Sequence, residues 1–121
     1  MTSANEEAGA LVDATATITA KTQVATLINV FTVKPENQRA LVEVLVRTTD
    51  AVMRHREGFI STVVHASIDG TRVTNYAQWQ TEAHLRAVLA DPAARQQMGE
   101  ARELSEGIEP HIYRVESVHR G

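Results

Sequence analysis

The chain has 121 residues, a formal net charge of −3 with histidine neutral, and an isoelectric point of about 5.9. This length suits one domain with its own hydrophobic core. The acidic balance argues against a nucleic-acid partner, because phosphate binding needs a basic surface. No apolar run approaches the ~18 residues of a membrane-spanning helix, so no membrane partner is expected. The absence of cysteine excludes disulfides, thiolate metal sites and cysteine nucleophiles. With no recognisable secretion signal, we expect a cytoplasmic protein.

Residues 1–22 form a distinct first segment. They are rich in Ala, Thr and Glu, contain no aromatic residue and show no sustained hydrophobic period. Such a segment buries too little apolar surface to fold alone. We therefore divide the chain into a flexible N-terminal extension, 1–22, and one folded domain, 23–121.

A strand and a helix are predicted to begin this domain. The strand, 24–33, is apolar on both faces, with Asn29 as the polar exception on its face. A helix is predicted over 34–55, because Pro35 suits a first turn, where its missing N–H costs least. The apolar stripe of this helix comprises Leu41, Leu45, Thr48 and Val52.

A β-hairpin gives the clearest local signal. Two alternating segments, 59–67 and 71–80, flank Asp69–Gly70. An Asp-Gly pair readily supplies the positive φ angles of a tight primed turn. We therefore expect these two segments to pair as antiparallel strands.

A second helix and a last strand are predicted to complete the domain. Thr81 is a suitable N-cap for a helix over 82–107, which Asp91–Pro92 is expected to interrupt. Residues 108–119 alternate as a strand should. The inward side of the helix is predicted to comprise Leu85, Val88 and Leu89.

The predicted order is β-α-β-β-α-β. This order is typical of an α+β, ferredoxin-like fold, with both helices on one face of a four-stranded antiparallel sheet. The other face of the sheet is left bare, and the first strand is apolar on that side too. We therefore expect a homodimer packed sheet to sheet, as a dimeric α+β barrel.

One group of polar and aromatic residues stands out as a candidate site. Alternation places Asn75 and Trp79 on one face of the third strand. If that face corresponds to the Asn29 face of the first strand, the three side chains converge between sheet and helices. An apolar chamber with a few placed polar groups is typical of a small-molecule site. Its walls are expected to include Phe31, Phe59, Leu85, Val88 and Leu89.

The simpler alternative for these residues is core packing. A lone tryptophan in a strand belongs to the core more often than to a site, and a strand asparagine usually satisfies nearby backbone. A buried carboxamide is costly unless it is paired, however. Two inward asparagines beside a tryptophan therefore favour the site.

Few other residues suggest chemistry. His84 follows Trp79 closely and is the candidate general base, since histidine titrates near neutral pH. Arg95 and Arg102 are interpreted as solvated helix residues, with contact to an acidic substrate group as the alternative. The histidines lack metal-ligand spacing, so no metal site is expected. No glycine-rich phosphate loop and no readable Ser-His-Asp set is present.

Two stretches carry a family resemblance. The segments INVFTVKPENQRALVEVL and GFISTVVHASIDGTRVTNYAQWQ resemble the antibiotic biosynthesis monooxygenase family, and the resemblance spans roughly residues 24–118. It implies a dimeric ferredoxin-like enzyme that oxidises anthrone-like or naphthol-like polycyclic aromatic polyketides to quinones with O2, without metal or flavin. It also implies that Asn29, Asn75 and Trp79 line the substrate cavity and serve catalysis.

The sequence departs from some members of that family. Certain relatives carry a tyrosine and an arginine at positions that fall near Leu85 and Gly99 here. Haem-degrading relatives place a histidine near Leu89, whereas His84 lies a turn or more away. Three alternatives therefore stay open: a non-oxidative isomerase or cyclase of a polyketide-like enol, a haem-degrading monooxygenase, and a non-catalytic accessory dimer.

Overall fold

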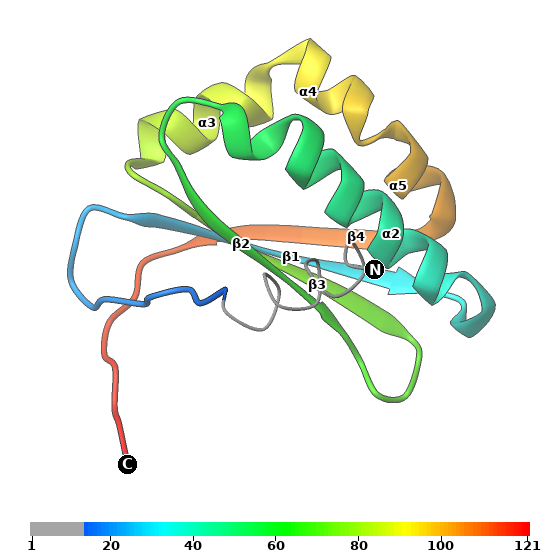
Figure 1. Ribbon diagram of the computed structural model, residues 1–121, viewed down its shortest axis with the longest axis horizontal. Coiled ribbons are helices and arrows are strands. Elements are labelled where there is room, and N and C mark those ends of the chain that lie inside the picture. Colours follow the sequence, from blue (N-terminus) through cyan, green and yellow to red (C-terminus); the bar gives the residue numbers. More distant parts are fainter. Residues whose placement is uncertain (1–13) are drawn as a thin grey trace, which may run out of the picture.

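The structure is a computed structural model that describes residues 14–121. Four strands form one antiparallel sheet in the order β2-β3-β1-β4, and the helices cover one of its faces (Figure 1). This confirms the predicted α+β ferredoxin-like arrangement. The elements are β1 Ala25–Val33, α2 Pro35–Ala51, the 3-10 turn η1 Met53–His55, β2 Phe59–Ala66, β3 Arg72–Trp79, α3 Glu82–Ala90, α4 Pro92–Gln97, α5 Gly99–Leu104 and β4 Ser105–Tyr113.

The helical layer differs from the prediction at several boundaries. Helix α2 ends at Ala51, and a 3-10 turn occupies the positions predicted as its last turn. The break at Asp91–Pro92 is confirmed: the Asp91 side chain accepts a hydrogen bond of 2.9 Å from the N–H of Ala93 and so caps α4. A second break, between α4 and α5 at Met98, was not predicted.

The last strand also lies elsewhere than predicted. It begins at Ser105, inside the segment predicted as helix, and ends at Tyr113 rather than at residue 119. Its partner β1 sets these limits, because the β1–β4 pairing runs only from Thr26↔Tyr113 to Val33↔Ser105. Beyond Tyr113 the chain leaves the sheet without regular structure (Figure 1).

The turn of the β2–β3 hairpin is longer than the predicted two-residue turn. The N–H of Gly70 donates to the carbonyl of Ser67 at 3.1 Å, and the N–H of Ser67 pairs with the carbonyl of Arg72 at 3.0 Å. Within the turn only Gly70 has a positive φ, of 83°. The primed turn was therefore wrong, because it needs positive φ at Asp69 as well.

The Asp69 carboxylate organises this turn instead. One of its oxygens accepts hydrogen bonds from the Thr71 N–H at 3.0 Å, the Thr71 hydroxyl at 2.7 Å and the Ser67 hydroxyl at 2.8 Å. These bonds, the Thr71 N–H first, lower the pKa of Asp69 from 3.8 to about 2. The charged carboxylate thus replaces the second positive-φ residue as the device that holds the turn.

The stability of this turn is expected to depend on pH. Folding lowers the pKa of Asp69. The charged carboxylate therefore stabilises the folded state above about pH 4, and this stabilisation disappears as the pH falls towards about 2. Urea midpoints of the parent protein and Asp69→Asn should differ at pH 5 and converge as the pH approaches 2. An offset that stays constant over this range would contradict the assignment.

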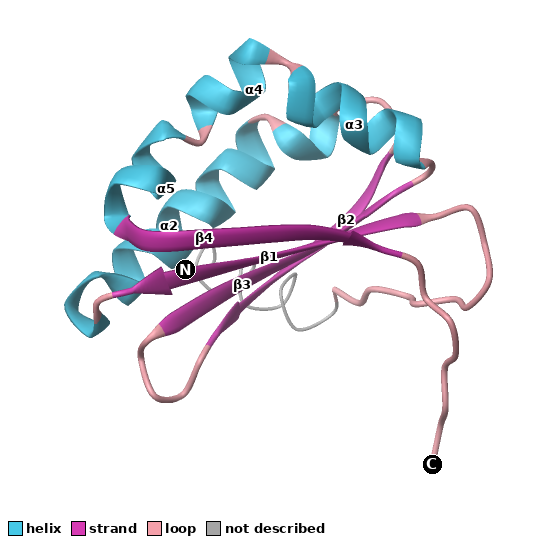
Figure 2. Ribbon diagram, turned by 180° about the vertical axis from the view of Figure 1, so that it is seen from behind, coloured by secondary structure: helices cyan, strands magenta, loops and turns pink. Residues whose placement is uncertain are grey.

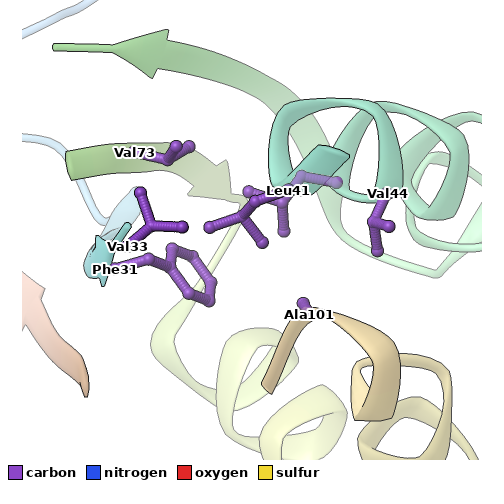
Figure 3. Packing of buried hydrophobic residues seen from close by; sticks show 7 residues of the cluster. Phe31, Val33, Leu41, Val44, Val73 and Ala101 are labelled. Carbon is purple, nitrogen blue, oxygen red and sulfur yellow. The ribbon is translucent and has the colours of Figure 1, made fainter. Parts of the chain in front are cut away.

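The core consists of two hydrophobic clusters under the helices. Figure 3 shows the first cluster, in which the Phe31 ring points from β1 towards Leu41 of α2 and Ala101 of α5. The second lies at the opposite end of the sheet, under α3 and α4. The first comprises Phe31, Val33, Leu41, Val44, Leu45, Val73 and Ala101, and the second comprises Ala25, Ala77, Trp79, Leu85, Val88 and Ala94.

None of the helices in the described part of the chain covers the opposite face of the sheet (Figure 2). The paired side chains Ile28 and Tyr76 lie on this face, and both are half-buried.

Part of the predicted extension, residues 1–13, lies outside the described residues. Residues 14–24 form no helix or strand, and the N–H of Lys21 donates to the carbonyl of Val115 at 2.9 Å. In the described part of the chain, no helix is both long and apolar enough to cross a membrane.

Candidate active site

Two asparagines lie directly opposite each other in the middle of the sheet. Strand register pairs Asn29 of β1 with Asn75 of β3, and pairs Ala25 with Trp79. Directly paired residues of antiparallel strands point to the same face. Asn29, Asn75 and Trp79 therefore share the helix-covered face of the two central strands.

The asparagine pair separates the two hydrophobic clusters. Along β1 and β3, the paired residues Phe31 and Val73 belong to the first cluster, while the paired Ala25 and Trp79 belong to the second. Apolar side chains at the Asn29↔Asn75 step would join the clusters into one core. The sequence instead places two carboxamides there, which is unfavourable for packing and favours a role in binding.

Three polar atoms on this face are buried without a hydrogen-bond partner among the described residues. They are Oδ1 of Asn29, Oδ1 of Asn75 and Nε1 of Trp79. An unsatisfied buried polar group costs about 1–3 kcal/mol of stability. The Trp79 ring itself is only 3% exposed and packs edge-on against Phe59, with ring centroids 5.4 Å apart and an interplanar angle of 88°. Its packing is satisfied, whereas its N–H is not.

A cavity of about 340 Å³ opens between β1, β4 and helices α3 to α5. Among the described residues of its wall, Asn29 is the one uncharged polar side chain. The residues that line it are Leu27, Asn29, Phe31, Met53, Val88, Leu89, Ala94, Arg95, Met98, Arg102, Ile108 and Pro110. This volume lies at the lower end of the range of small-molecule sites.

The structure brings only part of the predicted site to this cavity. Of the nine predicted residues, the wall includes Asn29, Phe31, Val88 and Leu89. The other five lie outside it, in the adjoining core and at the start of α3: Phe59, Asn75, Trp79, His84 and Leu85. Trp79 lies next to the cavity without lining it, since Val88 and Ala94 belong both to its cluster and to the cavity wall.

Leu85 and Leu89 occupy different places, although both were predicted to face inwards. Leu85 is fully buried in the second cluster. Leu89 is 42% exposed yet lines the cavity, so it faces the cavity opening rather than the packed core. Helix α3 ends after Ala90, and Leu89 stands on the open side of the cavity rather than beneath the helix.

His84 lies at the first turn of α3, away from the cavity wall. Its Nδ1 is 2.7 Å from the hydroxyl of Thr81, the N-cap of that helix, and its Nε2 is 3.8 Å from a carboxylate oxygen of Glu57. Its ring also packs on Gly58. These contacts describe a histidine that joins the start of α3 to the loop before β2.

Several cavity residues were not predicted. Ile108 and Pro110 come from β4, where alternation marks them once β4 is known to pair with Phe31 and Asn29 of β1. Met53 comes from the 3-10 turn and Met98 from the break between α4 and α5, where the sequence carries no periodic signal. Pairing and helix breaks therefore decide these positions.

An ion pair fixes the helical layer beside the cavity. The Arg56 guanidinium, just after the 3-10 turn, contacts the carboxylate of Asp91, the N-cap of α4. The Arg56 hydrogen bond, followed by that from the Ala93 N–H, lowers the pKa of Asp91. This contact ties the start of α4 to the segment that leads into β2.

Residues 14–121 contain no group of three or more His, Asp or Glu side chains that could hold a metal ion.

Fold and cavity together describe a ferredoxin-like α+β protein with a largely apolar cavity beneath its helices. Residues 25–99 match the antibiotic biosynthesis monooxygenase family. The chain is 51% identical over 77 residues to tetracenomycin-F1 monooxygenase of Streptomyces glaucescens. This alignment covers 64% of this chain and 69% of that protein. The chain therefore belongs to the antibiotic biosynthesis monooxygenase family, and its class of activity is that of a monooxygenase.

Solved structures agree with this assignment. A monooxygenase from the gene ActVA-Orf6 of Streptomyces coelicolor, in complex with nanaomycin D, is 29% identical with a TM-score of 0.72 and aligns over 80% of this chain and 91% of that one. SnoaB, a cofactor-independent oxygenase from Streptomyces nogalater, is 23% identical with a TM-score of 0.67, covering 79% and 96%. The second likeness supports the fold alone.

Proposed function

We propose that the protein is a cofactor-independent monooxygenase that oxidises an electron-rich polycyclic phenol, of the anthrone or naphthol type, to a quinone with O2. The observation that carries this proposal is the set of three unpartnered buried polar atoms, on Asn29, Asn75 and Trp79, at and beside an apolar cavity. The relative that acts on tetracenomycin F1 and the structure that holds nanaomycin D support an aromatic polyketide as substrate.

The substrate itself supplies the electrons for this reaction. Loss of a proton from the reacting CH2 group gives a delocalised enolate, which transfers one electron to O2. The resulting radical and superoxide combine to form a C–O bond, and protonation gives a hydroperoxide. Loss of water then breaks the O–O bond and leaves a carbonyl. One oxygen atom enters the product and the other leaves as water, so no external reductant is consumed.

The three polar side chains suit the charges that develop in these steps. A carboxamide can accept a hydrogen bond from a phenolic hydroxyl through oxygen and donate to an enolate through its NH2 group. Asn29 and Asn75 would stabilise the enolate, because donors fixed in an apolar site act most strongly where charge develops. The indole N–H of Trp79 would donate to a carbonyl or to reduced oxygen, and the apolar wall would hold the planar rings close to O2.

Oxygen consumption by chelator-treated protein tests this function. A panel of anthrones and naphthols is expected to show one O2 consumed per quinone formed. Under anaerobic conditions the conversion should stop. Continued conversion without O2 would instead identify an isomerase or cyclase, and a stoichiometric Soret shift on haem addition would identify a haem-binding protein. Absence of turnover with every aromatic substrate would favour an accessory dimer.

We further propose that the bare sheet face joins two copies of the chain. Ile28, Val30, Val63 and Tyr76 lie on this face, where the described helices cover nothing. Light scattering after size exclusion is expected to give twice the 13.3 kDa chain mass. Tyr76→Glu should shift the protein towards monomer, because an unpaired charge is costly in an apolar interface. A parent protein that stays monomeric at micromolar concentration would contradict the dimer.

A further inference from the structure

The cavity has two chemically different ends. Its inner wall is apolar apart from Asn29, while Arg95 of α4 and Arg102 of α5 stand on its exposed side. Leu89 and Ile108, also exposed, mark the same opening. Within residues 14–121, no aspartate or glutamate lines the cavity. The mouth is therefore locally positive on a chain whose net charge is −3.

Neither guanidinium at the mouth has an acidic partner among the described residues. Other arginines of the helical layer do: Arg47 contacts Glu100 at 2.9 Å, and Arg86 contacts Glu82 at 2.6 Å. Arg95 and Arg102 make no comparable ion pair within residues 14–121. Two positive groups thus border one opening with their charge uncompensated by the described part of the chain.

One of these guanidiniums is already held in place. Nη2 of Arg102 donates a hydrogen bond of 2.8 Å to the backbone carbonyl of Arg95. The same carbonyl, near the end of α4, also accepts a hydrogen bond from the N–H of Met98 at 3.2 Å. Because a guanidinium has five N–H donors in a fixed planar arrangement, the others stay free for a ligand. Ordering of Arg102 before binding lowers the entropy that a ligand would have to offset.

We propose that Arg95 and Arg102 form an anion subsite that binds a carboxylate carried by the aromatic substrate. A guanidinium matches a carboxylate through two parallel N–H···O bonds. The carboxylate would remain at the water-exposed mouth, where it keeps most of its hydration, while the rings enter the apolar cavity. The substrate would then be oriented with its reacting carbon towards Asn29. This inference rests on the proposed function for the aromatic body of the ligand.

Binding tests the subsite independently of turnover. Trp79 is the chain's one tryptophan and lies in the cluster next to the cavity, so its fluorescence reports binding. The probes are an anthraquinone with one carboxylate and its methyl ester. The parent protein should bind the acid more tightly than the ester, and added salt should reduce this preference. Each of Arg95→Gln and Arg102→Gln should weaken acid binding about 5-fold, and the double variant roughly 20-fold.

Matched variants and the ester serve as controls. Arg39→Gln removes the same charge from an exposed position on α2 that lies outside the cavity wall, and should change neither affinity. Ester binding should stay within about twofold of the parent in every variant, which shows that the cavity is intact. Arg102→Lys should restore only part of the acid preference, because an ammonium lacks the planar pair of donors. Equal affinity of the parent for acid and ester, or an equal loss of both, would overturn the subsite.

Turnover separates the subsite from the proposed function. With an anthrone carboxylic acid, the double variant should show a higher KM and a kcat close to that of the parent. The arginines would bind the carboxylate at the mouth, far from the reacting carbon. Oxidation of acid and ester with equal kcat/KM would overturn the subsite and leave the function standing. Charge-selective binding without any oxidation would contradict the function and uphold the subsite.

Discussion

Asn75→Ala is expected to lower kcat for quinone formation by about 100-fold while changing the free energy of unfolding by less than about 1 kcal/mol. The two effects have separate causes. Removing the amide removes a donor to the enolate, which matters most in the transition state. The same change also removes a buried oxygen that has no partner, so stability loses little. Steady-state kinetics and urea unfolding of the same preparation measure both quantities.

Thr74→Ala is the matched control for this prediction. Thr74 is the neighbouring residue of β3, is also half-buried, and points to the opposite face of the sheet. It should keep kcat within about twofold of the parent, because it lies away from the cavity. A kcat of Asn75→Ala within threefold of the parent would remove Asn75 from the catalytic proposal. A large loss of stability would show that the carboxamide serves the fold instead.

A double-mutant cycle tests whether the two asparagines act on one oxygen. Asn29 and Asn75 are direct partners across β1 and β3, so they are close enough to couple. If both stabilise the same enolate, Asn29→Ala combined with Asn75→Ala should cost less than the sum of the two single losses in activation free energy. Strictly additive losses would assign the two amides to different groups of the substrate.

The sequence could predict the strands and most of the fold because alternation and helix caps are local signals. Thr81 and Asp91–Pro92 are examples: each marks a helix boundary through its own backbone chemistry. The end of β4 at Tyr113 was not predictable in this way, since it depends on where β1 offers a partner. The predicted turn type at Asp69–Gly70 was wrong for another reason. Three hydrogen bonds to the Asp69 carboxylate outweighed the usual preference of an Asp-Gly pair for a primed turn.

The site was predictable only as far as strand faces could decide it. Alternation was sufficient to place Asn75 and Trp79 on one face of β3, whereas Asn29 joins that face only through its pairing with Asn75. It could not show that Trp79 lies under Val88 in the core, beside the cavity rather than in its wall. The arginines of the mouth depend on the break between α4 and α5, which turns Arg102 back onto the carbonyl of Arg95. Such placement follows from tertiary packing.

Gly58→Ala is expected to lower the free energy of unfolding by about 3 kcal/mol and the melting temperature by roughly 10 °C. Gly58 has a φ of 85°, which disfavours any residue with a Cβ. A Cβ at this position would also lie 2.3 Å from Cγ of His84, so the imidazole would have to move. That movement would break its contact with Thr81, the N-cap of α3. Thermal and urea unfolding measure the loss.

Gly70→Ala separates the cost of the positive φ from the cost of crowding against His84. Gly70 has nearly the same φ, 83°, but the nearest atom to a Cβ there is Cβ of Pro35 at 3.4 Å, an ordinary contact distance. It should therefore cost only the backbone strain, about 1 kcal/mol. In Gly58→Ala combined with His84→Ala the crowding is relieved, so the added alanine at 58 should cost about as much as at 70. If Gly58→Ala alone were no worse than Gly70→Ala, the imidazole would yield freely and His84 would not brace the start of α3.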